Sequence, residues 1–271
     1  MSKLDELITE LCPEGVKYKK IKQVYKRLKG TPITAGKMKE IDNPNGEIRI
    51  FAGGKTVINA MEKDIPNANI TRVPAVLVQS RGVIDAVYYD KPFTFKNEMW
   101  AYTADNEIAV KYLYYVLKSN LSHFRKAASG MGSLPQISLR VTEEFVIPVP
   151  PLPVQQEIVR ILDNFTELTA ELTAELTARR KQYEYYRDFL LTFGDEVEWI
   201  KLGEIADVTK LAGFEFTEHV RYSDSGKIIA LRGLNVKDGR LDLSQVKYID
   251  GSNFQKLSRS KLIKGDMLFT Y

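Results

Sequence analysis

Residues 148–193 decide the fold, and they read PVPPLPVQQEIVRILDNFTELTAELTAELTARRKQYEYYRDFLLTF. The alternating prolines at the start forbid a helix there and favour extended polyproline geometry. After Pro153, about 40 residues follow with no Gly or Pro, and apolar side chains recur at spacings of three and four. We therefore expect one long helix over residues 154–194, spanning about 55 to 60 Å.

A helix of this length needs a partner, because it is longer than a small domain is wide. Part of its apolar stripe must pack on another long helix, either within the chain or in a second chain. The side chains expected to carry this pairing are Leu168, Leu172, Leu176, Tyr183 and Tyr186.

A four-residue repeat, Thr-Ala-Glu-Leu, fills residues 169–172 and 173–176 in the middle of this helix. Four residues turn an α-helix by about 400°, so each copy rotates the leucine stripe by only about 40°. Each copy also lengthens the helix by about 6 Å. We interpret the repeat as a spacer. The alternative is a surface helix of good helix formers that carries a short duplication.

An α+β domain is expected before the long helix, over residues 1–153. Ser2 and Asp5 are placed as a capping box, which predicts a short helix over residues 2–11. A second helix, rich in Tyr and Leu, is expected over residues 107–126. Turn formers separate four β-rich segments, at residues 48–51, 75–79, 83–89 and 145–149.

The sequence after the long helix resembles the sequence at the start of the chain, which predicts a partial second copy of the domain over residues 195–271. Residues 197–205 align with residues 16–24 at an offset of 181, and residues 227–235 align with residues 47–55 at an offset of 180. Residues 264–270 also resemble residues 72–80. Because the second copy is about half as long as the first, we expect a truncated reading frame and an incomplete sheet.

Composition and motifs give little support for catalysis. Cys12 is the only cysteine, so no internal disulfide can form and a reducing, cytoplasmic compartment is expected. No apolar run reaches membrane-spanning length. The two histidines lack metal-ligand spacing, and the sequence contains neither GxxxxGK[ST] nor the Asp-x-Lys or Glu-x-Lys triplet of many metal-dependent nucleases. We therefore expect a protein that binds and does not catalyse.

The arrangement of domain, long helix and second domain resembles the specificity subunit of type I restriction–modification systems. The resemblance covers essentially the whole chain and includes the helix entry PPLPVQQEI at residues 150–158. Its most specific parts are LCPEGVKY at residues 11–18 and RKQYEYYR at residues 180–187. It implies that each globular domain is a target-recognition domain for one half of a split DNA sequence. It also implies that two long helices, one after each domain, pack antiparallel and fix the distance between the half-sites.

The resemblance further implies double-stranded DNA and two kinds of protein as partners. These are modification subunits, which use S-adenosylmethionine to methylate adenine, and restriction subunits, which use ATP and Mg to translocate and cut DNA. No cofactor is expected in this chain, which would be non-catalytic. Because a distal helix is missing, we expect two chains to pair through the long helix and to read a gapped palindrome. Two alternatives stay open, a coiled-coil protein-interaction module without DNA binding and an enzyme with an unrecognised site.

Positive charge is densest at residues 16–30, VKYKKIKQVYKRLKG, with seven Lys or Arg and no acidic residue. Such a run can contact phosphates, but it is equally a solvated surface. Basic candidates for phosphate contact in or next to loops are Lys26, Arg27, Lys29, Lys37, Lys55 and Arg81. Polar candidates for contact with base edges or phosphates are Thr31, Asn97, Ser129 and Ser133. For each of them, plain surface exposure is the alternative.

Overall fold

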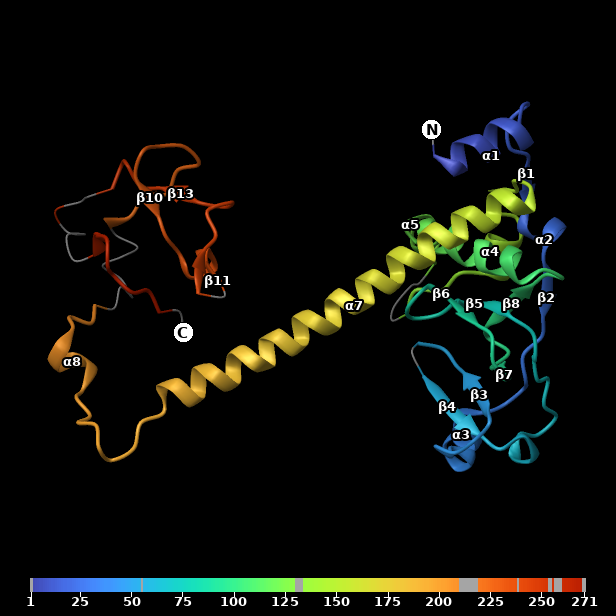
Figure 1. The fold of residues 1–271 in the computed structure, drawn as a ribbon, viewed down its shortest axis with the longest axis horizontal. Helices are drawn as coiled ribbons and strands as arrows, with labels where there is room; N and C mark the ends of the chain where they lie inside the picture. The colour runs from blue at the N-terminus through green and yellow to red at the C-terminus, as the bar shows by residue number, and fades with distance from the viewer. Residues whose placement is uncertain are drawn as a thin grey trace. The chain divides into compact units, whose positions relative to one another are not determined.

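The computed structural model describes residues 2–54, 56–129, 134–209, 219–237, 239–252, 255 and 260–269. The chain divides into two compact units, Met1–Tyr185 and Tyr186–Tyr271. Figure 1 shows the course of the chain through both. The long helix α7, Leu152–Leu191, is grouped for most of its length with the first unit, whereas the sequence suggested boundaries at residues 153 and 194.

Two sheets form the centre of the first unit. The four-stranded sheet has the order β2-β8-β5-β6, and all its neighbours are antiparallel. The three-stranded sheet has the order β4-β3-β7, with β3 and β7 parallel. The strands are β2 Lys26–Leu28, β3 Ile48–Phe51, β4 Val57–Ala60, β5 Ala75–Gln79, β6 Asp85–Tyr89, β7 Phe93–Phe95 and β8 Trp100–Thr103. The expected strands at residues 48–51 and 75–79 are confirmed with these bounds.

A two-stranded sheet ties the beginning of the unit to the start of the long helix. β1, Tyr18–Lys20, pairs antiparallel with β9, Val146–Pro148. The remaining elements of this unit are α1 Lys3–Leu11, α2 Ile21–Val24, α3 Ala35–Ile41, η1 Glu62–Asp64, α4 Glu107–Ser119, α5 Leu121–Lys126 and α6 Leu139–Glu143. α1 has the expected capping box of Ser2 and Asp5.

The helix expected over residues 107–126 is two helices. α4 ends at Ser119, and the backbone of its C-cap residue Asn120 leaves helical geometry at φ −107° and ψ 14°. Its side-chain amide donates to the carbonyl of Val116 at 2.8 Å. Asparagine favours such local bonds over continued helix, so the chain bends here and α5 begins afterwards.

The expected start of the long helix after Pro153 is wrong, because α7 already begins at Leu152. Pro153 is its second residue. A proline is tolerated in the first turn, since the N–H that it lacks has no partner inside the helix at that position. The buried Gln155 side chain helps to fix this start by donating to the carbonyl of Pro150 at 2.8 Å.

The core of the first unit lies on both faces of the four-stranded sheet. On one face, Val76, Val78 and Tyr102 pack against Leu113 and Leu117 of α4. On the other face, residues such as Leu77 and Ala101 pack against the phenylalanines of the three-stranded sheet. That sheet is covered in turn by α3 through Met38 and Ile41. The layers in order are therefore helices, four-stranded sheet, three-stranded sheet and α3 (Figure 1).

Thr142 is a buried polar contact that holds α6 against this core. Its hydroxyl accepts a hydrogen bond from the indole N–H of Trp100 at 2.9 Å and lies 2.8 Å from the hydroxyl of Tyr102. All three side chains are at most 8% exposed. α6 is thereby fixed beside β8, and it carries Glu143, with Glu144 directly after it.

Replacing Thr142 by valine is expected to destabilise the first unit, because it leaves two buried polar groups without their partner. Each such group costs about 1–3 kcal/mol. The midpoint of urea unfolding measures the effect. Thr142→Ser keeps the hydroxyl and loses only a methyl group, so it is the matched control. A Thr142→Val chain as stable as Thr142→Ser would contradict this role.

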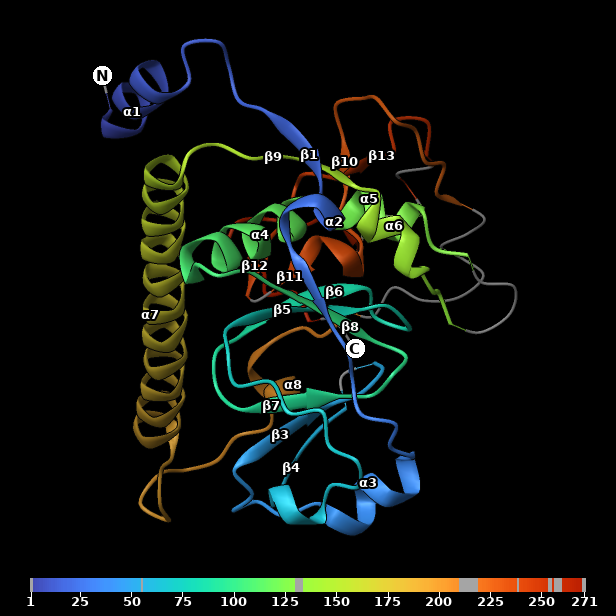
Figure 2. The same cartoon turned by 90° about the vertical axis from the view of Figure 1, so that its right-hand side faces the viewer.

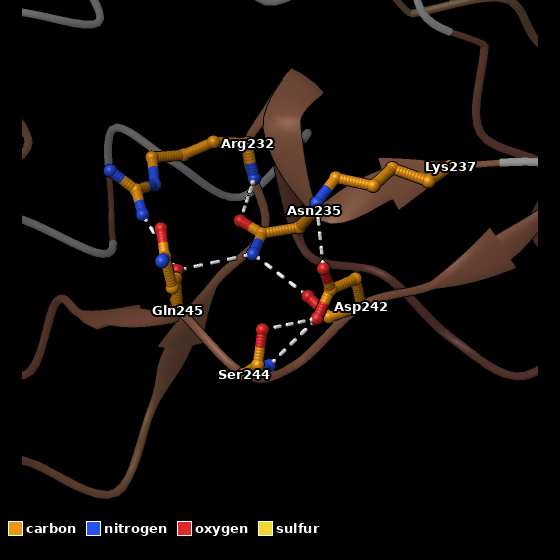
Figure 3. Close-up of polar contacts among 6 residues, drawn as sticks. All are labelled: Arg232, Asn235, Lys237, Asp242, Ser244 and Gln245. Carbon is orange, nitrogen blue, oxygen red and sulfur yellow. Dashed lines mark hydrogen bonds and ion pairs between the residues drawn. The ribbon is translucent and has the colours of Figure 1, made fainter. Parts of the chain in front are cut away.

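The described part of the second unit is held mainly by polar contacts. Among its described residues, Ala230 is the only buried hydrophobic side chain and Asn235 the only buried polar one. Asn235 accepts from the N–H of Arg232 at 3.0 Å and donates to the carbonyls of Asp242 and Gln245 at 2.9 and 3.2 Å (Figure 3). The elements here are α8 Leu202–Ile205, β10 Ile229–Ala230, η2 Gly233–Asn235, β11 Val236–Lys237, β12 Arg240–Leu241 and β13 Lys247–Tyr248.

The structure agrees with two of the three internal alignments. α8 with its N-cap Lys201 lies 181 residues after α2 with its N-cap Lys20, which is the offset read from the sequence. β10 falls inside the segment that aligns with β3. The third alignment has no counterpart, because the described residues 264–269 contain no strand.

Candidate functional site

Five segments of the first unit meet through hydrogen bonds and form one surface. We call this surface the loop cluster; it comprises residues 52–54, 80–82, 96–98 together with Ser129 and residues 134–137. The N–H of Gly54 donates to the carbonyl of Arg81 at 3.2 Å, and that of Gly82 to the carbonyl of Pro135 at 2.9 Å. Ser129 and Gln136 exchange two backbone bonds of 2.9 and 3.1 Å. Segments far apart in the sequence are thus joined at one place.

Glu98 joins segments of the loop cluster through both its carboxylate and its backbone carbonyl. Its carboxylate accepts from the N–H of Gly53 at 3.1 Å and from the Lys96 ammonium at 3.0 Å. Its carbonyl accepts from the hydroxyl of Ser80 at 2.6 Å. Partial burial raises the pKa of Glu98, but the bonds from Lys96 and Gly53 outweigh it and leave the pKa below its ordinary value. The carboxylate therefore stays ionised and keeps its partners.

Two glycines allow the chain to turn within the loop cluster. Gly54 and Gly82 have φ of +76° and +77°. Side chains rarely adopt this left-handed region, so glycine is the residue that these turns favour. The backbone of the loop cluster is therefore set by turn geometry and hydrogen bonds.

Three of the candidates from the sequence lie in the loop cluster, namely Arg81, Asn97 and Ser129, and all three are exposed. Gln136 is also exposed there and was missed by sequence reasoning. The signal that points to it is its place shortly after the glycine-containing segment SGMGS at residues 129–133. Lys55 and Ser133 lie outside the residues that the structure describes.

The other basic candidates lie on the edge of the sheet and on α3. Lys26 and Arg27 belong to the edge strand β2, and Lys29 follows it; all three are exposed. A guanidinium nitrogen of Arg27 lies 3.5 Å from a carboxylate oxygen of Glu143. Lys37, on α3, forms an ion pair of 2.9 Å with Glu40. These cations are not part of the loop cluster.

Part of the basic run is used for structure. Lys20 pairs with Glu144 at 2.7 Å, and Lys22 bonds to the other oxygen of the same carboxylate. These hydrogen bonds from Lys20 and Lys22 lower the pKa of Glu144 to about 2. Lys20 and Lys22 therefore pair with an acidic residue at the end of α6. Less of the positive charge in residues 16–30 is left for a ligand than the sequence suggested.

Thr31 does not fit its expected role at a base edge. The residue is fully buried, at 0% exposure. Its hydroxyl lies 2.7 Å from the hydroxyl of Thr94 and accepts from the N–H of Asn69 at 2.9 Å. The hydroxyl therefore links strand β7 to the backbone of Asn69 inside the fold, and it is not presented to solvent.

Among the described residues, the buried side chains of the long helix lie near its start. Val154, Gln155, Glu157 and Val159 are buried, whereas every residue of α7 from 164 onward is exposed. Asp163 contacts α4, which lies beside α7 in Figure 2. The outer part of α7 therefore carries exposed side chains on all of its faces.

A row of large apolar side chains lies on the side of α7 away from α4. We call it the apolar stripe; at about 100° per residue its members fall within an arc of about 80°, centred opposite Asp163. The predicted pairing residues Leu168, Leu172, Leu176, Tyr183 and Tyr186 are 52%, 65%, 70%, 66% and 51% exposed. Phe165 and Leu190, at 64% each, complete the stripe. Exposed apolar side chains along one line of a helix are typical of an interaction surface.

The threonines of the repeat extend this apolar surface. The hydroxyls of Thr169, Thr173 and Thr177 each donate to the carbonyl four residues earlier, at 2.7, 2.7 and 2.8 Å. With the hydroxyls bonded to their own helix, the methyl groups of these residues are left to make outside contacts. The repeat therefore has leucines and threonine methyls on neighbouring lines.

The described residues show neither a metal site nor a membrane span. No group of three or more His, Cys, Asp or Glu in this part of the chain is placed to hold a metal ion. No helix among the same residues combines the length and apolar character needed to cross a bilayer.

Comparison with known proteins gives consistent matches. Residues 13–179 match the family model described as "Type I restriction modification DNA specificity domain". The Escherichia coli EcoR124I/EcoR124II specificity subunit is 51% identical over 107 residues, which is 37% of this chain and 26% of that protein. The Mycoplasma pneumoniae putative type I specificity subunit S.MpnORF507P is 28% identical over 200 residues, covering 72% of this chain and 53% of that protein. The matched part is thus about a quarter to a half of these relatives.

Among solved structures, the chain is similar to the S subunit of a type I restriction–modification system from M. genitalium. The TM-score is 0.47 and the sequence identity 20%, with 63% of this chain and 45% of that chain covered.

Proposed function

Because this chain belongs to the type I restriction modification DNA specificity family, we propose that its first unit reads one half of a split DNA sequence for a type I restriction–modification complex. The observation that supports this most is the loop cluster, which presents Arg81, Asn97, Ser129 and Gln136 on one surface inside the matched region. These residue types suit DNA contact. A guanidinium pairs with phosphate or guanine, and amides pair with adenine.

The loop cluster is built to hold these side chains in place before DNA arrives. Its backbone bonds and the Glu98 contacts join all of its segments. A surface that is already ordered loses less conformational entropy on binding. Lys96 is bonded to Glu98 and is 24% exposed, so we assign it to holding the loops. The exposed side chains are assigned to the DNA.

Replacing Arg81 by alanine is expected to weaken DNA binding by about 1–3 kcal/mol, or about 5- to 150-fold. If Arg81 contacts a phosphate, the slope of log affinity against log salt also falls by about one. Fluorescence anisotropy with a duplex over a salt series measures both quantities. Arg72→Ala is the matched control, because Arg72 precedes β5 whereas Arg81 follows it, and Arg72 pairs with Glu62. Equal binding by the Arg81 and Arg72 variants would remove Arg81 from the interface.

We further propose that two chains pair through the apolar stripe of α7. The stripe is exposed and points away from the domain, so a second long helix has room to pack on it. The helix is acidic between residues 167 and 175 and basic between 179 and 181. An antiparallel partner with its two-fold axis near Leu176 places these opposite charges against each other. A parallel partner would place like charges together.

Such a two-fold pair presents two identical target-recognition domains to DNA. Identical domains related by a two-fold axis read the same half-site on opposite strands, so the expected target is a palindrome with a gap. The repeat at residues 169–176 would then act as the spacer that sets this gap. Pairing, the palindrome and the spacer role form one connected hypothesis.

The remaining partners are proposed from the family. We expect modification subunits that carry S-adenosylmethionine and methylate adenine, and restriction subunits that use ATP and Mg. This chain would direct both activities to DNA and catalyse neither. A coiled-coil interaction module without DNA binding is not favoured, because the match to a DNA specificity domain includes the globular domain as well as the helix.

A further inference from the structure

Asp163 joins α7 to α4 through both of its carboxylate oxygens, and Thr166, three residues later, lies 3.5 Å from the Tyr115 hydroxyl. One Asp163 oxygen accepts from the hydroxyl of Tyr115 at 2.5 Å. The other Asp163 oxygen lies 2.7 Å from the ammonium of Lys111. Both partners come from α4, one turn apart. We call Lys111, Tyr115 and Asp163 the Asp163 clasp. Figure 2 shows α4 and α7 next to each other.

The α4 side of the clasp is fixed to the sheet. Val110, Leu113 and Leu117 are at most 1% exposed in the core of the first unit. The Lys111 ammonium also lies 5.5 Å from the centre of the Tyr88 ring. Burial, followed by the bond to Asp163, raises the pKa of Tyr115 to about 12, so its hydroxyl keeps its proton at working pH. The clasp therefore joins α7 to a rigid part of the domain.

Beyond the clasp, residues 164–191 of α7 are all exposed. The tilt of the helix at the clasp therefore changes the position of its outer part in proportion to the distance from Asp163. Leu176, the proposed crossing point of the paired helices, lies 13 residues beyond Asp163, a distance of about 20 Å. A tilt of about 10° at the clasp would move that point by about 3.5 Å, close to the rise of one base pair. Small changes in tilt thus correspond to whole steps along DNA.

We propose that Asp163 is a positioning residue that fixes the tilt of α7 on its target-recognition domain and thereby sets the number of base pairs between the two half-sites. This inference rests on the proposed function. The number of repeat units sets the length of α7, whereas the clasp sets the tilt of α7 on its domain. Without the clasp, the half-sites are still read, but the distance between them is no longer held to one value.

The test compares the full chain with Asp163→Ala on a series of duplexes. The duplexes carry the half-sites preferred by the wild type, separated by its preferred gap or by gaps one or two base pairs shorter or longer. We expect the wild type to favour one gap over its neighbours by about tenfold, and the variant to favour it by less than about threefold. Binding to a single half-site is expected to stay unchanged. Asp188→Ala, also exposed on α7, is the matched control and keeps the wild-type preference.

Tyr115→Phe removes only one hydroxyl and repeats the test with little risk to folding. It is expected to relax the gap preference in the same direction as Asp163→Ala. If both variants keep the tenfold preference for one gap while binding the half-site normally, the clasp does not set the gap and the inference is wrong. If the wild type does not distinguish its half-site from a scrambled one, the proposed function itself is wrong and this inference falls with it.

Discussion

Replacing Leu172 by aspartate is expected to leave the chain monomeric at micromolar concentration. Leu172 is 65% exposed in the single chain and lies in the middle of the apolar stripe. Burying a leucine contributes about 1.5–3 kcal/mol, and a two-fold pair loses this contribution twice. The loss of about 3–6 kcal/mol corresponds to about 10²- to 10⁴-fold weaker association, before the cost of burying two carboxylates is counted. Light scattering and sedimentation velocity measure the change.

Ala174→Asp is the matched control for this experiment. It places the same charge in the same repeat, but on the side of the helix away from the apolar stripe. Any general effect of aspartate on helix stability is therefore shared by both variants. The control is expected to remain paired. A Leu172→Asp chain that stays dimeric would mean that the apolar stripe is not the pairing surface.

Deleting residues 173–176 is expected to shorten the gap in the recognised sequence by one or two base pairs. One Thr-Ala-Glu-Leu unit contributes about 6 Å of helix, against about 3.4 Å for each base pair. The deletion turns the rest of the apolar stripe by only about 40°, so the leucines still meet a partner helix. Binding to the original gapped site is expected to be lost, while each half-site keeps its sequence.

The gap in the selected DNA sequences gives the measurement for this deletion. Inserting a third copy of the unit should lengthen the gap by the same amount, which excludes simple damage to the helix as the cause. Thr173→Ala keeps the length of the helix and should keep the gap. An unchanged gap in both the deletion and the insertion would end the interpretation of the repeat as a spacer.

The sequence predicted those parts of the fold that depend on local patterns. The capping box at Ser2 and Asp5, the strands at residues 48–51 and 75–79 and the long helix all follow from spacing and composition within a few residues. β7 and β8 were not predicted, because they are only three and four residues long and are buried on both faces, so local periodicity gives little signal. The parallel pairing of β3 with β7 joins segments that only the tertiary fold brings together.

The candidate site was predicted in part for the same reason. Arg81, Asn97 and Ser129 were found because loops carry functional side chains. That they share one surface depends on hydrogen bonds between five separate segments, which no local pattern shows. Thr31 looked like a loop hydroxyl but points into the fold. In the basic run, Lys20 and Lys22 pair with Glu144, more than 120 residues away along the chain.

The most direct test of the account is a selection of bound sequences from random duplex DNA. This chain is mixed with its modification subunits and S-adenosylmethionine, and assembly of the complex is shown beforehand. The account predicts enrichment of a gapped palindrome, because two copies of the same target-recognition domain are presented by paired helices. Enrichment of an asymmetric split site would contradict the paired arrangement, and no enrichment from an assembled complex would contradict the DNA-reading role itself.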